Sequence, residues 1–505
     1  MNETLGRPWL VASLGLALAA LAPAAGAALE STPCPMAVAN GQAVNCYFFT
    51  VPENHDQPDK RQIQLFVAAV QPYEAVPEPD PLIFLAGGPG RPATDFVAES
   101  WEDMGSLLHR RQMLYVDQRG TGYSRPVLDC KTLYTLSPTL REDWLACLQR
   151  YREEGIDLAS YNTVQSARDL AALRRALEVD QWNVLGVSYG TRFALELLRT
   201  DPEGVRSLVL DSVLPNFEGN YSEGFIAEQK KVFDKVFMDC AAQAACAKTF
   251  PDLRQTFLAI EERLRQGPVV LQYARGDEVR DLEVGLDEFV DRLKAEMFFA
   301  PFNTIPMFIG AFKRLLDGEE LHVDRQVIAN LFARHQNRDS RYALGQHMAI
   351  SCQEMWPKVN LEDASLEMED FLPYVNANAV FRDYQVGCQA AALPPIDPAF
   401  YQPVRSAIPT LILSGDYDAL TPAIWAAETS QFLPNSTLLR FNGVGHDVIG
   451  TNACAATLMQ SFVADPQATL PVACVQRTRP PQFATDPTPF RGEVGVTVTP
   501  KVLAE

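Results

Sequence analysis

Basic residues are scarce in this chain. Its 505 residues include 43 lysines and arginines against 63 aspartates and glutamates, so the formal net charge is −20 at pH 7. A protein that binds nucleic acid needs a basic surface to meet the phosphates. The charge balance therefore argues against a nucleic-acid partner and favours an ordinary acidic, solvated surface.

Metal-binding patterns and late membrane-spanning runs are also missing. The sequence has ten cysteines but no C-x-x-C pair, and its six histidines form no histidine–cysteine pattern typical of a zinc site. We therefore expect neither a metal nor another cofactor. Beyond the N-terminal region no stretch resembles a transmembrane helix, and the sequence shows no internal repeat.

The single long apolar run lies at the N-terminus. Arg7 precedes the apolar residues 9–21, and the small residues Ala25 and Ala27 follow. Secretory signal peptides have the same order: a charged region, then an apolar region, then an A-x-A cleavage site. We therefore predict that residues 1–27 are removed and that the protein is exported, to the periplasm or out of the cell. A retained membrane anchor is the less favoured alternative, because the run is short for a membrane span.

The cysteines agree with export. An even number in an exported chain predicts disulfides, although the sequence does not determine their connectivity. Pairing between near neighbours is our expectation. It gives five pairs: Cys34–Cys46, Cys130–Cys147, Cys240–Cys246, Cys352–Cys388 and Cys454–Cys474.

Strand and helix patterns alternate along residues 28–214. Residues 61–70 alternate apolar with polar or small side chains, which is the period of a strand. Residues 81–90 form a short apolar run that ends in glycines, as a buried strand entering a loop does. Residues 163–179 carry leucines at helical spacing. This alternation predicts an α/β fold with a mostly parallel central sheet covered by helices on both faces.

The pattern changes after residue 214. Residues 215–405 contain few strand patterns and many helical ones, which predicts a mainly helical cap inserted into the α/β domain. The strand–helix alternation resumes over residues 406–475. Residues 476–505 form a Pro-rich C-terminal tail, a composition typical of loosely ordered chain.

A serine between two glycines stands where one strand is predicted to end and a helix to begin. The segment "GVSYG" places Ser188 between Gly186 and Gly190. At such a sharp turn, side chains in place of the glycines would collide with the neighbouring strand and helix, and the serine hydroxyl is exposed at the sheet edge. Ser188 is therefore predicted to be a nucleophile, which needs a base.

Only one histidine suits the role of that base. In the enzymes that carry this turn the order along the chain is serine, acid, histidine, and His446 follows the last predicted strand. His55 and His109 precede the serine. Three others stand in helical or charged surroundings of the inserted segment, which are typical of surface groups: His322, His335 and His347.

The acid that orients His446 is expected after the preceding strand. The segment "GDYDALTP" offers Asp416 and Asp418; we favour Asp418 and regard the other as a turn or capping residue. Asp447 directly follows the histidine in sequence, and a neighbouring residue is poorly placed to form a hydrogen bond with the histidine ring. The backbone N–H groups of Gly88 and Tyr189 are predicted to form an oxyanion hole.

The five motifs together resemble one family. "GGPG", "DQRGTGYS", "GVSYG", "GDYDALTP" and "GVGHD", in this order, look like the prolyl iminopeptidase and tripeptidyl aminopeptidase family of α/β-hydrolase serine exopeptidases. The resemblance spans about residues 60–215 and 405–465. It implies that Ser188, Asp418 and His446 are the nucleophile, acid and base, and that the substrates are peptides with a free N-terminus.

The resemblance also suggests roles outside the triad. Asp117 and Arg119 of "DQRGTGYS" would be structural, as a buried pair that shapes a loop near the active site. The chain has Ala86 where prolyl iminopeptidases usually have histidine, and its export signal and cysteines look more like the secreted tripeptidyl aminopeptidases. "AISCQEMWP" resembles a cap motif of that branch, which makes Glu354 the candidate for binding the substrate amine. An ordinary solvated glutamate is the alternative.

Two other functions compete with the exopeptidase. An exported carboxylesterase or lipase would use the same triad, although a lipase is expected to have a more apolar cap entrance. A hydrolase-like binding protein without catalysis is disfavoured, because the serine, acid, histidine and glycine loop are all present. The oligomeric state is not determined by the sequence.

Overall fold

The computed structural model describes most of the chain. The described residues are 29–36, 42–74, 76–97, 109–130, 140–217, 223–275, 278–286, 288–290, 292–293, 302–319, 325, 327–328, 341–359, 377–486 and 496–500. The predicted signal peptide, residues 1–27, lies outside them. Within these ranges none of the helices combines the length and apolar composition that a membrane crossing requires.

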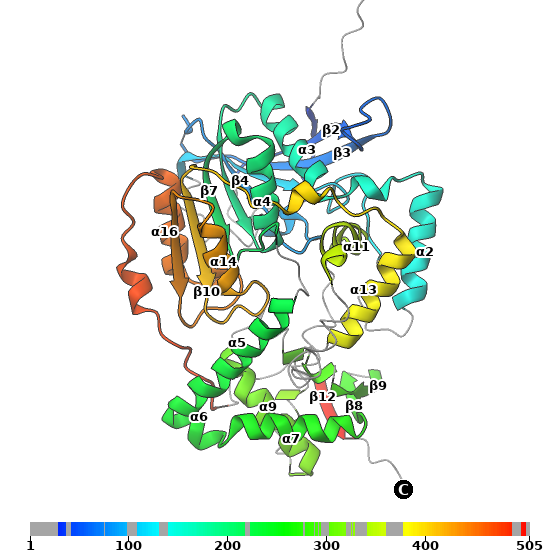
Figure 1. Cartoon of the computed structure of the whole chain (residues 1–505), viewed down its shortest axis with the longest axis vertical. Coiled ribbons are helices and arrows are strands. Elements are labelled where there is room, and N and C mark those ends of the chain that lie inside the picture. Colours follow the sequence, from blue (N-terminus) through cyan, green and yellow to red (C-terminus); the bar gives the residue numbers. More distant parts are fainter. Residues whose placement is uncertain are drawn as a thin grey trace, which may run out of the picture.

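The larger of the two sheets in the described residues lies in the upper part of the molecule in Figure 1, with helices around it. Its strand order is β1-β2-β3-β5-β4-β6-β7-β10-β11. The strands are β1 (Leu29–Thr32), β2 (Val44–Pro52), β3 (Gln62–Val70), β4 (Leu82–Leu85), β5 (Met113–Asp117), β6 (Trp182–Val187), β7 (Val205–Asp211), β10 (Thr410–Gly415) and β11 (Ser436–Phe441). The six strands from β5 to β11 run parallel, and β1 to β3 join them as an antiparallel edge. The predicted mostly parallel sheet is confirmed.

Helices cover both faces of this sheet because its strands are apolar on both sides. In β3, Leu65 and Val67 pack with the first helix layer, whereas Phe66 and Ala68 pack with the second. The first layer contains α3 (Thr163–Ala176), α4 (Tyr189–Thr200) and α14 (Ala423–Ser430). The second contains η1 (Ala93–Phe96), α15 (Val448–Thr451) and α16 (Ala453–Ala464).

The chain between β7 and β10 forms two separately packed parts. The first contains α5 (Glu223–Ala242), α6 (Ala244–Thr249), α7 (Leu253–Arg265), β8 (Val269–Arg275), β9 (Glu278–Val284), η5 (Phe302–Thr304) and α9 (Ile305–Asp317). These elements bury a large apolar cluster of their own and lie together below the sheet in Figure 1.

The second part packs against the core instead. It contains α11 (Leu344–Ile350), the π-helical turn η6 (Ser351–Met355), η7 (Trp356–Lys358), α13 (Ala377–Ala391) and η8 (Pro398–Tyr401). Ala349 and Ala391 share an apolar cluster with Trp144 and Leu148 of α2 (Leu140–Glu153). Two short turns, η3 (Leu158–Ser160) and η4 (Pro202–Gly204), complete the core.

The C-terminal tail is not loosely ordered where the structure describes it. Strand β12 (Val496–Pro500) pairs antiparallel with β8, which also pairs with β9, so that the tail completes a three-stranded sheet. The buried Phe483 joins the apolar cluster of the inserted segment, and the neighbouring Ala484 N–H donates to the carbonyl of Asn303 over 2.9 Å. Proline content misled the prediction, because a proline-rich chain can still be held by burial and pairing with distant residues.

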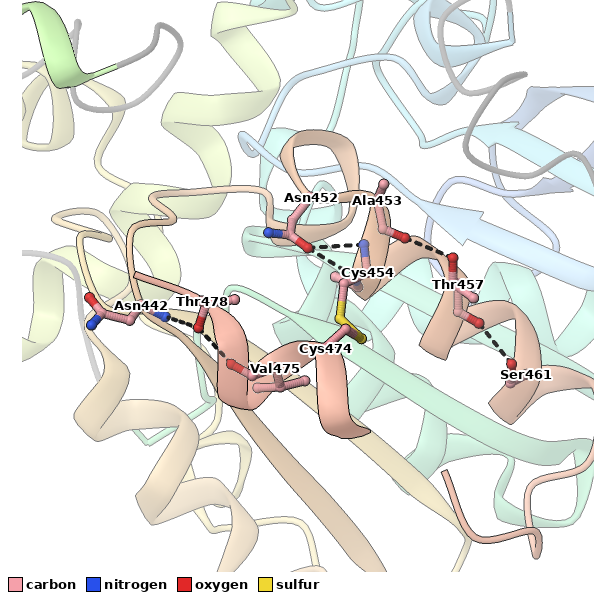
Figure 2. Close-up of a disulfide and its surroundings, with 10 residues drawn as sticks. Asn442, Asn452, Ala453, Cys454, Thr457, Ser461, Cys474, Val475 and Thr478 are labelled. Carbon is pink, nitrogen blue, oxygen red and sulfur yellow. Dashed lines mark hydrogen bonds between the residues drawn. A yellow bond between two sulfur atoms is a disulfide. The ribbon is translucent and has the colours of Figure 1, made fainter. Parts of the chain in front are cut away.

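All five expected disulfides are present, so the pairing between near neighbours is confirmed. Figure 2 shows Cys454–Cys474, which joins the start of α16 to η9 (Val472–Arg477). Next to it, the Thr478 hydroxyl accepts the N–H of Asn442 over 3.1 Å, just after β11. The disulfide and this hydrogen bond fix the chain that leaves α16 beside the last strand of the sheet.

Candidate active site

Ser188 occupies a strained turn between β6 and α4. Its φ of 61° lies in a region that residues other than glycine rarely adopt. A Cβ atom on Gly190 would lie 2.0 Å from the carbonyl oxygen of Leu85, and one on Gly186 would lie 2.4 Å from the oxygen of Gly190. The two glycines are therefore needed because strand and helix approach too closely for side chains, as the sequence analysis predicted.

Asp418 and His446 meet at the same sheet edge. They follow β10 and β11, which lie parallel to β6 and β7 in the order β6-β7-β10-β11, so they stand at the same carboxyl-end edge of the sheet as the turn of Ser188. Nδ1 of His446 lies 2.9 Å from Oδ2 of Asp418. Both side chains are buried, with exposed fractions of 8% for His446 and 1% for Asp418.

The pair stabilises the charged form of the histidine. Burial lowers the pKa of His446, but the charge and hydrogen bond of Asp418 outweigh it and raise this pKa above its ordinary value. Burial raises the pKa of Asp418, but His446 and the bonds from Thr421 outweigh it and hold this pKa below its ordinary value. The arrangement can therefore take up a proton on the imidazole and hold it.

The two other acids near His446 have different partners. Asp416 accepts from the Nε and Nη2 atoms of Arg440 over 3.0 and 2.6 Å, on the protein surface. Asp447 accepts the N–H of Gly450 over 3.1 Å and caps α15. The structure thus brings Asp418, and not Asp416, to the histidine ring.

The glycine loop (residues 86–91) passes directly against the serine. A Cβ atom added to Gly87 would lie 2.9 Å from Cβ and 3.4 Å from Oγ of Ser188. Gly88 has a φ of +114°, which favours glycine. Tyr189 is the first residue of α4, where backbone N–H groups have no partner within the helix. Glycine backbone therefore approaches the serine hydroxyl beside the first N–H groups of α4.

Comparison with known proteins agrees with this geometry. The family described as alpha/beta hydrolase fold matches residues 80–453. This chain belongs to the α/β-hydrolase fold family. Serine protease Hip1 of Mycobacterium tuberculosis is 24% identical over 468 residues, which cover 85% of this chain and 86% of that protein.

Two shorter matches carry the names that the motifs predicted. Proline iminopeptidase of Aeromonas sobria is 30% identical over 196 residues, covering 37% of this chain and 42% of that protein. Tripeptidyl aminopeptidase of Streptomyces lividans is 29% identical over 234 residues, covering 41% of this chain and 42% of that protein. The resemblance to this group of α/β-hydrolases is confirmed.

His347 of this α/β-hydrolase lies against the glycine loop rather than on the outer surface. Its Nδ1 is 3.0 Å from the carbonyl oxygen of Pro89 and 2.6 Å from the hydroxyl of Tyr342, and its Nε2 is 2.5 Å from the hydroxyl of Tyr384. Burial lowers the pKa of His347, so the ring is neutral near pH 7. Sequence patterns could not predict this contact, because Pro89 and His347 are 258 residues apart.

The predicted pairing of Asp117 with Arg119 is wrong. Asp117 accepts the backbone N–H groups of Thr94 and Tyr123 over 2.9 and 2.8 Å. Arg119 instead donates to both carboxylate oxygens of Asp169 in α3, over 2.8 and 2.6 Å. Strand β5 ends at Asp117, so the alternation that would place the side chains of residues 117 and 119 on the same side ends there.

His322 and His335 lie outside the described residues.

The structure does not support Glu354 as the group that binds the substrate amine. Its side chain is completely buried, and its two oxygens accept from the N–H and hydroxyl of Thr163 over 2.7 and 2.8 Å. Arg192 of the serine helix α4 is 4.0 Å away. Glu354 therefore joins the starts of α3 and α4 from inside the protein, and an ammonium group would have to break these contacts to reach it.

Proposed function

We propose that this α/β-hydrolase is an exported serine exopeptidase, an aminopeptidase that releases tripeptides, dipeptides or proline from peptide N-termini. The observation that carries the proposal is the 2.9 Å contact between His446 and Asp418 on the sheet edge that also presents Ser188. The names of the three relatives support a peptidase rather than another hydrolase.

In the proposed mechanism Ser188 forms an acyl-enzyme. Its Oγ attacks the carbonyl carbon of the scissile bond while Nε2 of His446 accepts the hydroxyl proton. Asp418 keeps the proton on Nδ1 and stabilises the imidazolium. The N–H groups of Gly88 and Tyr189 donate to the oxyanion.

The tetrahedral intermediate then collapses to the acyl-enzyme, and the acyl-enzyme is afterwards hydrolysed. His446 first gives its proton to the leaving amine, which departs as the shortened peptide. A water molecule next loses a proton to His446 and attacks the ester carbonyl, and Ser188 recovers its proton when the released acid departs.

Export and access to the site are parts of the same proposal. Five disulfides that use all ten cysteines suit an oxidising compartment, either the periplasm or the exterior. The inserted residues 215–405 would act as the cap that limits substrate length. In support, the ring of Tyr342 lies 3.1 Å from the position of a Cβ atom on Gly90, so the insertion reaches the glycine loop.

The test is a substrate panel for the mature protein. It compares Pro-, Ala-Ala-Pro- and N-acetyl-Ala-Ala-Pro-anilides with a short-chain ester, and the Ser188→Ala variant is the control. Cleavage of free peptide anilides but not of the acetylated one is the expected result. Ester turnover without any amide cleavage would show an esterase and would refute the exopeptidase. Equal activity of Ser188→Ala would refute the site itself.

A further inference from the structure

Three strained residues meet at the proposed site. Six non-glycine residues of the described chain have positive φ, and three of them are Ser188 (61°), Ser212 (59°) and Asp447 (60°). Such conformations are strained and persist only where surrounding contacts enforce them. Because all three lie at one edge of the sheet, contacts that hold the loops in place are expected there.

Asp211, the last residue of β7, contacts both loops that carry the proposed nucleophile and base. Its carbonyl oxygen accepts the N–H of Ser188 over 2.9 Å. Its completely buried carboxylate accepts the N–H groups of Val448 and Ile449, just after His446, over 3.0 and 2.8 Å. One residue therefore bonds to both loops from the strand between them.

Ser212 extends the same connection. Its hydroxyl accepts the N–H of Asp447 and donates to Oδ1 of Asp211, each over 3.0 Å. Its own N–H donates to the carbonyl of Leu413 in β10, the strand that leads to Asp418, again over 3.0 Å. The end of β7 is thus bonded to each of the three segments that carry the proposed triad.

We propose that Asp211 and Ser212 are positioning residues that hold the loop of His446 in register with Ser188. This inference rests on the proposed function, because it assigns a role relative to that triad. A proton transfer between a serine and a histidine requires a short, aligned contact, and His446 stands in a loop that has no strand partner of its own. The bonds from Asp211 and Ser212 hold the backbone that directly follows His446, whereas the N–H of Tyr417 holds the loop at Val444, before the histidine, over 3.0 Å.

The charge of Asp211 adds a measurable signature. Together with Asp418 and Asp447 it raises the pKa of His446. Burial raises the pKa of Asp211 itself to about 7, and the charge of Asp447 contributes to this rise. The charge of Arg91 lowers the pKa of Asp447. Because Asp211 is charged mainly above about pH 7, removing its charge is expected to move the acid limb of the serine's reactivity only slightly to lower pH.

The test measures how fast a fluorophosphonate probe labels Ser188, per molecule of folded protein, between pH 5 and 9. We expect Asp211→Asn to label about 10- to 100-fold more slowly than wild type, because small misplacements of reacting groups cost this much. Its acid limb should also shift slightly to lower pH. Ser212→Ala removes both hydrogen bonds of the hydroxyl, of which only the one from Asp447 N–H reaches the loop of His446. It should lose about 3- to 10-fold, the worth of that one bond, with an unshifted limb.

Asp80→Asn is the matched control. Asp80 is also a buried acid of this sheet, but it lies at the opposite edge and binds Arg111 and Asn183. Its substitution should lower stability and leave labelling per folded molecule unchanged.

Two results would overturn the inference. The first is that both Asp211→Asn and Ser212→Ala are labelled within about twofold of the wild-type rate, with no shift in the pH profile. The second is that Asp80→Asn loses as much labelling rate as Asp211→Asn. If Asp211→Asn does not fold, Ser212→Ala alone decides. An unlabelled wild-type protein would refute the proposed function rather than this positioning role.

Discussion

Replacing Asp418 by asparagine is expected to reduce kcat/KM by about ten-thousand-fold. The reason lies in how its carboxylate is bound. Oδ1 accepts the backbone N–H groups of Leu420 and Thr421 over 2.8 and 2.9 Å, which leaves Oδ2 to face His446. In Asp418→Asn the amide oxygen must keep the two backbone bonds, so the amide nitrogen faces the imidazole.

That nitrogen can only donate, so His446 has to present an unprotonated Nδ1. The ring proton then moves to Nε2, the atom that should accept the proton of Ser188. A change of this kind in a serine–histidine–aspartate triad costs about 10⁴-fold, or about 5 kcal/mol of transition-state stabilisation. Because the charge that raises the pKa of His446 is also lost, the acid limb of the residual activity should move to lower pH.

The assay is turnover of the best anilide of the substrate panel, with Asp416→Asn as the matched control. Asp416 is two residues away and pairs with Arg440 on the surface, and exposed ion pairs contribute about 0–1 kcal/mol. The control should therefore retain activity within about twofold. A loss below tenfold in Asp418→Asn, or a large loss in Asp416→Asn, would show that the proposed acid is assigned wrongly.

Four further outcomes are expected. Ser188→Ala should lower anilide turnover by about a million-fold, and retention of wild-type turnover would contradict the triad. Burial raises the pKa of Glu354 to about 7, so its neutral form is favoured in the folded protein and wild-type stability should fall as pH rises from about 4.5 through 7. Glu354→Gln should lessen this decline in urea unfolding, to which the raised pKa of Asp211 also contributes, without changing the preference for free N-termini; a lost preference would restore Glu354 as the amine-binding group. Gly190→Ala should cost about 3 kcal/mol in the same measurement, because the added methyl group meets backbone atoms, and wild-type stability would contradict that contact. Replacing Cys352 and Cys388 together by serine should cost about 3–4 kcal/mol, since their sequence separation of 36 residues closes a long loop, whereas unchanged unfolding would show that the disulfide does not constrain the unfolded chain.

The sequence by itself determined the features that depend on neighbouring residues. The strand periodicity before Ser188 and the helical pattern after it indicate the turn, and only glycine fits two residues before and two residues after that serine. The disulfides could be paired correctly because each joins cysteines 6 to 36 residues apart, distances that a single loop or helix closes. The order serine, acid, histidine likewise needs no coordinates.

Tertiary structure alone decided where charged side chains point. The sequence offers both Asp416 and Asp418 and favours Asp418, but the side-chain contacts come from the fold: Asp416 faces Arg440 at the surface and Asp418 faces His446 inside. Glu354 looks like a ligand for a substrate amine, yet it is buried against Thr163, 191 residues away. The physical reason is that burying an unpaired carboxylate costs free energy, so each buried acid must pair with a group that the fold brings close to it. That group can be far away in the sequence, so the residues around the acid do not identify it.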